Sequence, residues 1–419
     1  MFSRRYSVLL KALNLGRKDA LTKQVEICSK LVEPQVPLND PFSIVSHEMT
    51  NLGKNIASLI GSNHPTLNKV SSYYFGAQGK HVRPMIVLLL SKALSEIPAS
   101  ERIRPVDNAD VRANPKANGV NDPLSPLAIL HGINPDLVLN PLSKSQDDLP
   151  SSVDGILPKQ RRLAEIVEMI HTASLLHDDV IDNSDTRRSL PSGNVAFSNK
   201  MAILAGDFLL ARASVAIARL RNAEVIELLS TTIANLVEGE FMQLKNTANS
   251  KSADAHYVSF QYYIHKTYLK TASLMSKSCR ATAVLASCND DVIDATYRFG
   301  RSLGLCFQIV DDMLDYTTAG QTLGKPSGAD LKLGLATAPV LYAWEEYPEL
   351  GDMINRKFSV EGDVELAREL VEKAGGVERT RLLAKQYHDE ALEHLSILPD
   401  SEALSGLRSL THTVLSRKH

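Results

Sequence analysis

Apolar residues recur at intervals of three and four positions along most of this chain, a periodicity typical of amphipathic α-helices. One such face comprises Leu163, Ile166, Val167, Ile170 and Ser174. The alternating patterns and turn signals that indicate strands and hairpins are absent. The sequence therefore predicts an all-α fold, and a length of 419 residues implies a helical bundle around a large central core.

Two regions depart from this pattern. Residues 98–158 hold nine of the 19 prolines, among Asn, Asp and Ser, so we expect a long surface insertion between two helices. It is either a tolerated loop or a regulatory or partner-binding segment. Residues 1–30 are basic and acid-poor with leucines on one side, which is typical of a mitochondrial transit peptide; the alternative is a basic first helix of the mature fold. Residues 31–419 are predicted to form a single all-α domain.

The overall composition excludes several classes of protein. The net charge is −2, so nothing global indicates nucleic acid binding. The four cysteines show no metal-ligand or redox spacing and are expected to be reduced core thiols; they are Cys28, Cys279, Cys288 and Cys306. No apolar stretch approaches the length of a membrane span, so any membrane association should be peripheral.

Two acidic motifs lie inside the helical patterns. They are DDVID, from Asp178 to Asp182, and DDMLD, from Asp311 to Asp315. Residues four apart share one face of a helix, so each motif presents a pair of carboxylates. Buried carboxylates need a cation or a metal, and Mg²⁺ prefers one or two carboxylates together with substrate phosphates. Two facing pairs would therefore clamp a diphosphate through shared Mg²⁺.

Basic and hydroxyl side chains gather in short motifs around the acidic ones. They are Lys80 and Arg83 in GKHVRP, the pair Arg187-Arg188, Lys270 and Thr271 in KTA, and Lys325 in GKPSGADL. Adjacent arginines suit bidentate phosphate contacts, and a cationic glycine-rich loop suits a lid over a leaving group. Taken singly, each motif is usually a solvated turn or a surface salt bridge. Their joint order indicates a diphosphate site.

The motif order GKxxRP, DDxxD, RR, GExMQ, KTA, FQxxDDxxD and GKxxGxDL resembles that of the trans-isoprenyl (polyprenyl) diphosphate synthases. The similarity covers essentially all of residues 40–419. It is greatest to the fungal mitochondrial branch that makes the hexaprenyl-type tail of ubiquinone. The chain departs from many relatives at Gln78 and Ser189, where they have glycine. Neither departure removes a charge, so activity is not put in doubt.

The resemblance implies an isoprenoid-synthase-type bundle in which Mg²⁺ assists the successive condensation of isopentenyl diphosphate onto an allylic diphosphate such as farnesyl diphosphate. About three Mg²⁺ ions would bind with the substrate. The implied metal ligands are Asp178, Asp182, Asp311, Asp312 and Asp315. The residues implied for isopentenyl diphosphate are Lys80, Arg83, His171 and Arg188. Those implied for the allylic diphosphate are Arg187, Lys270, Thr271, Gln308 and Lys325. The residues expected to act in catalysis are Asp178, Asp182, Asp311, Lys270, Thr271 and Gln308.

Three residues on the first acidic helix carry further expectations. A lone histidine on an apolar face is usually a core residue, but His171 lies seven residues before Asp178, where the family has its isopentenyl-site histidine. Ala173 and Ser174, one turn before Asp178, are both small, whereas short-chain relatives have aromatic residues there. We therefore expect an open tunnel and a long product, which Ala173→Phe would shorten.

Other functions share parts of this pattern. A non-catalytic subunit of a heteromeric prenyl synthase would be expected to lose site residues that this chain keeps. A terpene cyclase shares the first acidic motif, but it replaces the second and has no use for Lys80 and Arg83. A purely structural helical protein would leave the buried acidic pairs unexplained. The resemblance further implies a homodimer, or a heteromer with a second chain, bound peripherally on the matrix side of the mitochondrial inner membrane.

Overall fold

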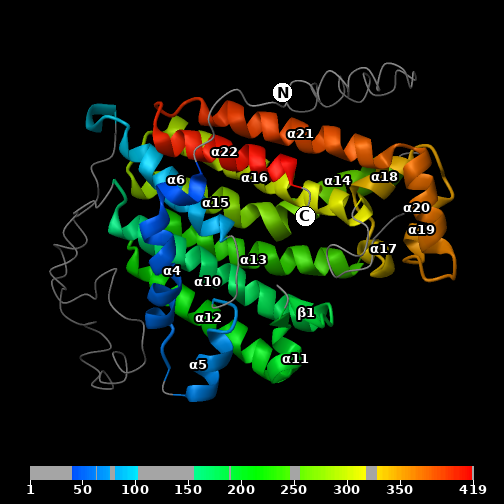
Figure 1. The fold of residues 1–419 in the computed structure, drawn as a ribbon, viewed down its shortest axis with the longest axis horizontal. Helices are drawn as coiled ribbons and strands as arrows, with labels where there is room; N and C mark the ends of the chain where they lie inside the picture. Colours follow the sequence, from blue (N-terminus) through cyan, green and yellow to red (C-terminus); the bar gives the residue numbers. More distant parts are fainter. Residues whose placement is uncertain are drawn as a thin grey trace. The chain divides into compact units, whose positions relative to one another are not determined.

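The computed structural model describes residues 40–62, 64–75, 81–101, 155–187, 190–245, 255–317 and 328–417, and most of these residues are helical (Figure 1). The expected transit peptide and most of the proline-rich insertion lie outside the described residues, so both stay predictions. The all-α fold class is confirmed. In the described part the strands are a two-residue pair, β1 (Thr186–Arg187) and β2 (Leu190–Pro191), which pair antiparallel.

The helices before the second acidic motif follow in this order: α3 (Pro41–Ile44), α4 (Ser46–Leu59), α5 (Pro65–Ser71), α6 (Val82–Ser95), the 3₁₀ turn η1 (Ala99–Glu101), α10 (Pro158–Ile181), α11 (Gly193–Phe197), α12 (Asn199–Arg219), α13 (Ala223–Lys245), α14 (Ala255–Thr267), the π-helical turn η3 (Tyr268–Ala272) and α15 (Ser273–Leu285). The remainder are α16 (Asp290–Thr317), α17 (Ala329–Lys332), α18 (Ala338–Trp344), α19 (Leu350–Asn355), α20 (Asp363–Lys373), α21 (Gly376–Leu395) and α22 (Glu402–Ser416).

Helix α10 lies in the interior of the bundle. It packs against α4, α6, α11, α12 and α15, and every residue from Leu163 to Ile170 is buried. A helix that is covered on all sides belongs to the core. The first turn contains Pro158, where a missing N–H costs nothing, and the side chain of Gln160 accepts a hydrogen bond from the N–H of Leu157 at 3.0 Å. The helix is therefore fixed at its start, and its packing holds Asp178 and Asp182 at its C-terminal end in place.

Helix α16, which carries the second acidic motif, approaches its neighbour unusually closely. A Cβ atom on Gly300 would lie 2.7 Å from the carbonyl oxygen of Met275, and one on Gly304 would lie 2.6 Å from the Cα of Ala272. Glycine is the residue that allows such a close backbone approach. The two glycines thus set the distance between α16 and the run η3–α15, and with it the distance between the second acidic motif and the KTA segment.

Two further expectations from the sequence concerned the cysteines and the length of the apolar segments. Cys279, Cys288 and Cys306 are free and buried, as predicted, whereas Cys28 lies outside the described residues. Helix α12, however, is long and apolar enough to cross a membrane by length and composition alone, with a mean hydropathy of 1.7. The expectation that no segment approaches span length was wrong for this helix, because its few charges are scattered among apolar residues. Core helices of soluble proteins also meet this criterion.

Candidate active site

A single large cavity of about 1310 Å³ brings most of the predicted residues together. Its walls come from α3, α6, α10, β1, α13, α14, η3, α16, α17 and the C-terminal end of α22. The charged side chains that line it are Asp40, Arg83, Glu168, Asp178, Asp182, Arg187, Lys266, Lys270, Asp311, Asp312, Asp330 and Arg417. Apolar residues such as Met85, Leu175 and Phe307 line other parts of the wall. The cavity can therefore hold a strongly charged group and an apolar chain at the same time.

Asp178 and Asp182 stand at the C-terminal end of α10. The N–H of Asp182 donates to the carbonyl of Asp178 at 2.8 Å, and both carboxylates line the cavity. A helix C-terminus carries partial negative charge, which makes two carboxylates there unfavourable without a cation. Burial raises the pKa of Asp178 to about 6 and also raises the pKa of Asp182. The pair is therefore a place where binding a cation lowers the free energy.

Because the pKa of Asp178 is raised, the difference in stability between Asp178→Asn and the wild type should depend on pH. The folded protein binds this proton more tightly than the unfolded chain, so ionisation lowers the stability of the metal-free protein as pH rises from about 4 to about 6. Asp178→Asn removes this loss. In metal-free buffer the Tm of Asp178→Asn minus that of the wild type should grow as pH rises through this range. A difference that stays constant from pH about 4 to about 7 would contradict this.

The second acidic motif occupies the last turns of α16, another helix C-terminus. Asp311 lines the cavity and forms an ion pair with Arg417, close to the end of the chain. The guanidinium of Arg417 also stacks on the ring of Phe307 at 4.2 Å and donates to its carbonyl oxygen at 3.4 Å. Asp311 thus lines the same cavity as Asp178 and Asp182, with a cation beside it.

Asp312 and Asp315 have different environments from Asp311. Asp312 is 5% exposed, and its two carboxylate oxygens accept hydrogen bonds from Tyr263 at 2.7 Å and Gln308 at 2.8 Å. Asp315 accepts from the N–H groups of Ala329 at 3.1 Å and Asp330 at 3.2 Å, so it caps the short helix α17. The carboxylates of Asp312 and Asp315 are thus engaged in hydrogen bonds within the protein. Asp311 is therefore the residue of this motif best placed to contact a metal.

The predicted cations and hydrogen-bonding groups that fall within the described residues lie around the same cavity. Arg83 at the start of α6 contacts His171 on α10 at 3.0 Å between Nη1 and Nε2. Lys270 donates to Glu240 at 2.6 Å and to Gln243 at 3.0 Å, and Thr271 donates to Gln308 at 2.8 Å. The π-helical turn that contains Lys270 and Thr271 is a distortion common at functional sites. Lys80, Arg188 and Lys325 lie outside the described residues.

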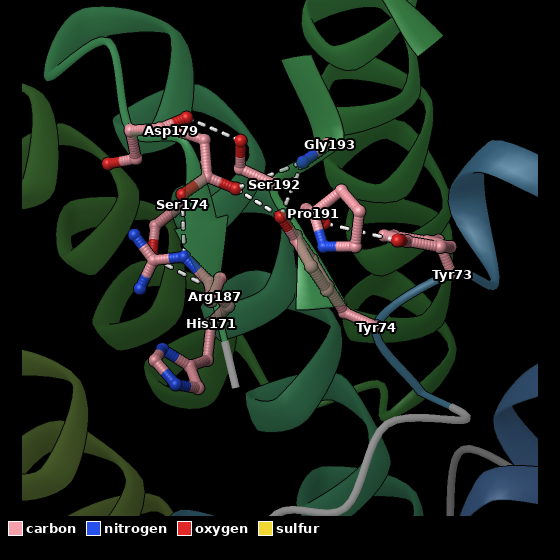
Figure 2. A network of polar contacts seen from close by, with 10 residues as sticks. Tyr73, Tyr74, His171, Ser174, Asp179, Arg187, Pro191, Ser192 and Gly193 are labelled. Atoms are coloured by element: carbon pink, nitrogen blue, oxygen red, sulfur yellow. Dashed lines mark hydrogen bonds and ion pairs between the residues drawn. The ribbon is translucent and has the colours of Figure 1, made fainter. Parts of the chain in front are cut away.

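Arg187 is held in place by the second residue of the first motif, Asp179, which is 0% exposed (Figure 2). The Nε of Arg187 donates to Asp179 at 2.6 Å. On the other side Asp179 accepts from the hydroxyl of Tyr74, which in turn accepts from the N–H of Gly193 at 2.6 Å. This network ties the β1–β2 segment to α10. Asp179 is therefore a positioning residue, and the motif divides between residues that face the cavity and one that faces inward.

Comparison with known proteins identifies the family. A sequence model described as polyprenyl synthetase matches residues 145–371, more than half of the chain. The chain belongs to the polyprenyl synthetase family. It is 69% identical to a probable mitochondrial hexaprenyl pyrophosphate synthase of Yarrowia lipolytica, over 94% of this chain and 88% of that protein. It is 53% identical to the mitochondrial hexaprenyl pyrophosphate synthase of Saccharomyces cerevisiae, over 96% of this chain and 95% of that protein.

Solved structures of polyprenyl synthases share the fold. A decaprenyl diphosphate synthase from Rhodobacter capsulatus, 27% identical, matches 90% of this chain and 98% of that chain with a TM-score of 0.69. A polyprenyl synthase from Caulobacter crescentus, complexed with calcium and isoprenyl diphosphate, is 26% identical and matches 90% of this chain and 97% of that chain with a TM-score of 0.68. The predicted family and its prenyltransferase activity are confirmed.

Members of the polyprenyl synthetase family use isopentenyl diphosphate and allylic diphosphates and generally require Mg²⁺, and the donor set in this cavity suits that metal. Asp178, Asp182 and Asp311 offer hard oxygen ligands. Among the described residues no three Asp, Glu, His or Cys side chains form a complete metal site. Mg²⁺ held by these carboxylates would take further ligands from diphosphate oxygens and water, which is its usual way of binding.

The two residues predicted to control product length have different places in this polyprenyl synthetase. Ser174 lines the cavity, and its hydroxyl donates to the carbonyl of His171 at 2.8 Å. Ala173 is 0% exposed and is not part of the cavity wall. A large side chain at Ala173 would therefore meet packed core atoms, while one at Ser174 would point toward the tunnel.

The motifs did not identify two charged cavity residues of this polyprenyl synthetase, Glu168 and Arg417. Glu168 contacts His81 at 2.8 Å and fixes the start of α6. Helical spacing could have identified Glu168, because it lies one turn before His171 on the same face. Arg417 has no local sequence signal, since its partner Asp311 is 106 residues away.

Proposed function

We propose that the protein is a Mg²⁺-dependent polyprenyl diphosphate synthase that condenses isopentenyl diphosphate successively onto an allylic diphosphate such as farnesyl diphosphate. Its product would be the long-chain, hexaprenyl-type tail of ubiquinone. The observation that carries this proposal is the pair of acidic helix ends, with Asp178 and Asp182 on one and Asp311 on the other, which line one cavity together with Arg83 and Lys270. The names of the fungal relatives support the product.

The candidate residues form two groups, one for each diphosphate. Arg83 and His171, together with Lys80 and Arg188, would hold isopentenyl diphosphate; Arg187 and Lys270, together with Lys325, would hold the allylic diphosphate. Mg²⁺ bound to the aspartates would neutralise the charge on the leaving diphosphate. Preorganised cations in a cavity with low dielectric constant favour that developing charge more than water does.

The allylic carbocation that remains needs protection from water and stabilisation by oxygen dipoles. Thr271 and Gln308 are hydrogen-bonded to each other, and Gln308 is fixed by Asp312. Their oxygens are therefore preorganised close to Lys270, where the C–O bond would break. The double bond of isopentenyl diphosphate then attacks the cation, and a proton is lost.

Ser174→Phe should shorten the product. The ring would fill the tunnel on the wall of α10 that Ser174 lines, so elongation should stop several isoprene units earlier, while the first condensation should proceed. Product lengths measured by reversed-phase chromatography check this. The matched control is Ser214→Phe, at an exposed position of α12 that does not line the cavity; it should not change the product. An unchanged product from Ser174→Phe would exclude this tunnel direction.

The oligomeric state and location are part of the proposal. Large apolar side chains are exposed on neighbouring helices α12 and α13, including Leu204 at 58%, Val237 at 54% and Phe241 at 61%. Such a surface is typical of an interface, and we propose that a second copy of this chain covers it, with a heteromer as the alternative. The relatives are named mitochondrial, which supports peripheral binding at the matrix side of the inner membrane, where an apolar product can partition into lipid.

The release of inorganic diphosphate distinguishes the proposed activity from its rivals. A polyprenyl synthase releases diphosphate from farnesyl diphosphate only when isopentenyl diphosphate and Mg²⁺ are also present. A terpene cyclase releases it from the allylic substrate alone. A non-catalytic subunit releases none in either mixture, although it is folded by circular dichroism. We expect the first result from purified protein, abolished by EDTA; either of the others would refute the proposal.

A further inference from the structure

Lys266 differs from the other cations of the cavity. Among the described residues, the cavity-lining arginines and Lys270 each contact a hydrogen-bonding partner in the protein. Lys266 lines the same cavity, but no hydrogen bond or ion pair involves its ammonium group in the described part of the chain. The ammonium nitrogen lies 5.8 Å from the ring centroid of Tyr263.

The carboxylates around Lys266 do not take the place of such a partner. Asp312 is the acid with the largest electrostatic effect on Lys266, but its oxygens already accept hydrogen bonds from Tyr263 and Gln308. Burial lowers the pKa of Lys266 below its ordinary value. Lys266 is partly exposed and lines the cavity, and among the described residues no acceptor binds its ammonium group. A ligand in the cavity could therefore supply that acceptor.

The position of Lys266 indicates which ligand it would meet. It lies one helical turn before Lys270, and Thr267 and Thr271 line the cavity beside these two lysines. The candidate residues for isopentenyl diphosphate, Arg83 and His171, belong to α6 and α10 instead. Lys266 thus shares a wall with the groups proposed for the allylic diphosphate.

We infer that Lys266 binds the diphosphate of the allylic substrate from the side of the second acidic motif, as an additional cation beside Lys270. This inference rests on the proposed function. The ammonium group would donate to a non-bridging oxygen of the diphosphate. As the C–O bond of the substrate breaks, the bonding electron pair moves onto that diphosphate, so the charge-assisted hydrogen bond strengthens. Lys266 would then assist both binding and departure of the leaving group.

The test compares Lys266→Met with the wild type. Methionine keeps the length of the side chain and removes the charge. The dissociation constant for inorganic diphosphate in the presence of Mg²⁺, measured by titration calorimetry, should rise about 10- to 100-fold. The KM for farnesyl diphosphate should rise by a similar factor, while the KM for isopentenyl diphosphate should stay near the wild-type value. The Tm should not fall, because among the described residues the ammonium group makes no hydrogen bond or ion pair whose loss would cost stability.

Two further variants make the comparison specific. Lys277→Met is the matched control: Lys277 is a partly buried lysine of α15, the continuation of the same helical run, but it donates to Thr231 at 2.8 Å and does not line the cavity. It should leave diphosphate binding unchanged. Lys266→Arg keeps a charge at the site and should restore much of the affinity that Lys266→Met loses.

Each outcome decides the question. Wild-type diphosphate affinity in Lys266→Met would overturn the inference, and so would a lower Tm with both KM values raised, which is the result of a structural role. A wild-type protein that makes no product would refute the proposed function instead. The titration with inorganic diphosphate needs no product, so it would still decide whether Lys266 binds this group.

Discussion

Asp178→Asn should lower kcat/KM for the condensation at least about a thousandfold without unfolding the protein. Asn keeps the shape of the side chain but removes the negative charge that would bind Mg²⁺ at the end of α10. The diphosphate would then leave without full neutralisation of its charge. Because burial raises the pKa of Asp178 to about 6, the charged form is unfavourable in the metal-free protein. The variant should therefore be at least as stable as the wild type when metal is absent.

Steady-state kinetics with saturating Mg²⁺ and a thermal melt in EDTA measure the two effects. The matched control is Asp291→Asn, at an exposed position in the first turn of α16, which is distant in the chain from both acidic helix ends. It should keep near wild-type activity. Near wild-type activity in Asp178→Asn would show that this carboxylate is not a metal ligand.

Asp179→Asn, one residue along, should differ from Asp178→Asn in its effect on stability, because it should destabilise the fold by about 3 kcal/mol. Asp179 is 0% exposed and forms the buried side of an ion pair with Arg187 at 2.6 Å. Removal of its charge leaves the guanidinium without its counterion and weakens the acceptor for Tyr74. Equilibrium unfolding in urea measures the loss. Activity should fall as well, because Arg187 loses the contact that holds it at the cavity.

Two neighbouring tyrosines provide the control for this network. Tyr74→Phe removes the hydroxyl that links Asp179 to Gly193 and should cost about 1–3 kcal/mol, the cost of a buried group left unpaired. Tyr73→Phe removes an exposed hydrogen bond to the carbonyl of Pro191 and should cost about 0.5 kcal/mol or less. Equal losses in the two variants, or a stable Asp179→Asn, would contradict the structural role of the network.

The sequence was sufficient to predict the fold class and the first acidic pair, because both depend on local periodicity. The spacing of four between Asp178 and Asp182 places them on one helix face wherever the helix lies. The assignment of Arg83, His171 and Lys270 to one diphosphate or the other followed only from the family resemblance. The structure brings those three residues to the same cavity, but the diphosphate that each one binds is still a proposal.

Other features depend on contacts between distant segments and have no local signal. Asp311 and Asp312 are adjacent, and only the positions of Tyr263 and Arg417 show that one is enclosed by hydrogen bonds while the other faces the cavity. The network around Asp179 requires a tyrosine 105 residues away. The spacing of small residues likewise placed Ala173 and Ser174 together, although packing buries the first and leaves only the second in the cavity wall.

The central claim is tested most directly by the length of the product. Purified protein without residues 1–30 would be incubated with farnesyl diphosphate, labelled isopentenyl diphosphate and Mg²⁺, and the products would be separated by chain length. Our account predicts a narrow distribution of long, hexaprenyl-type products, absent with EDTA and absent from Asp178→Asn. A folded protein that makes no product under these conditions, or one that stops after a single condensation, would contradict it.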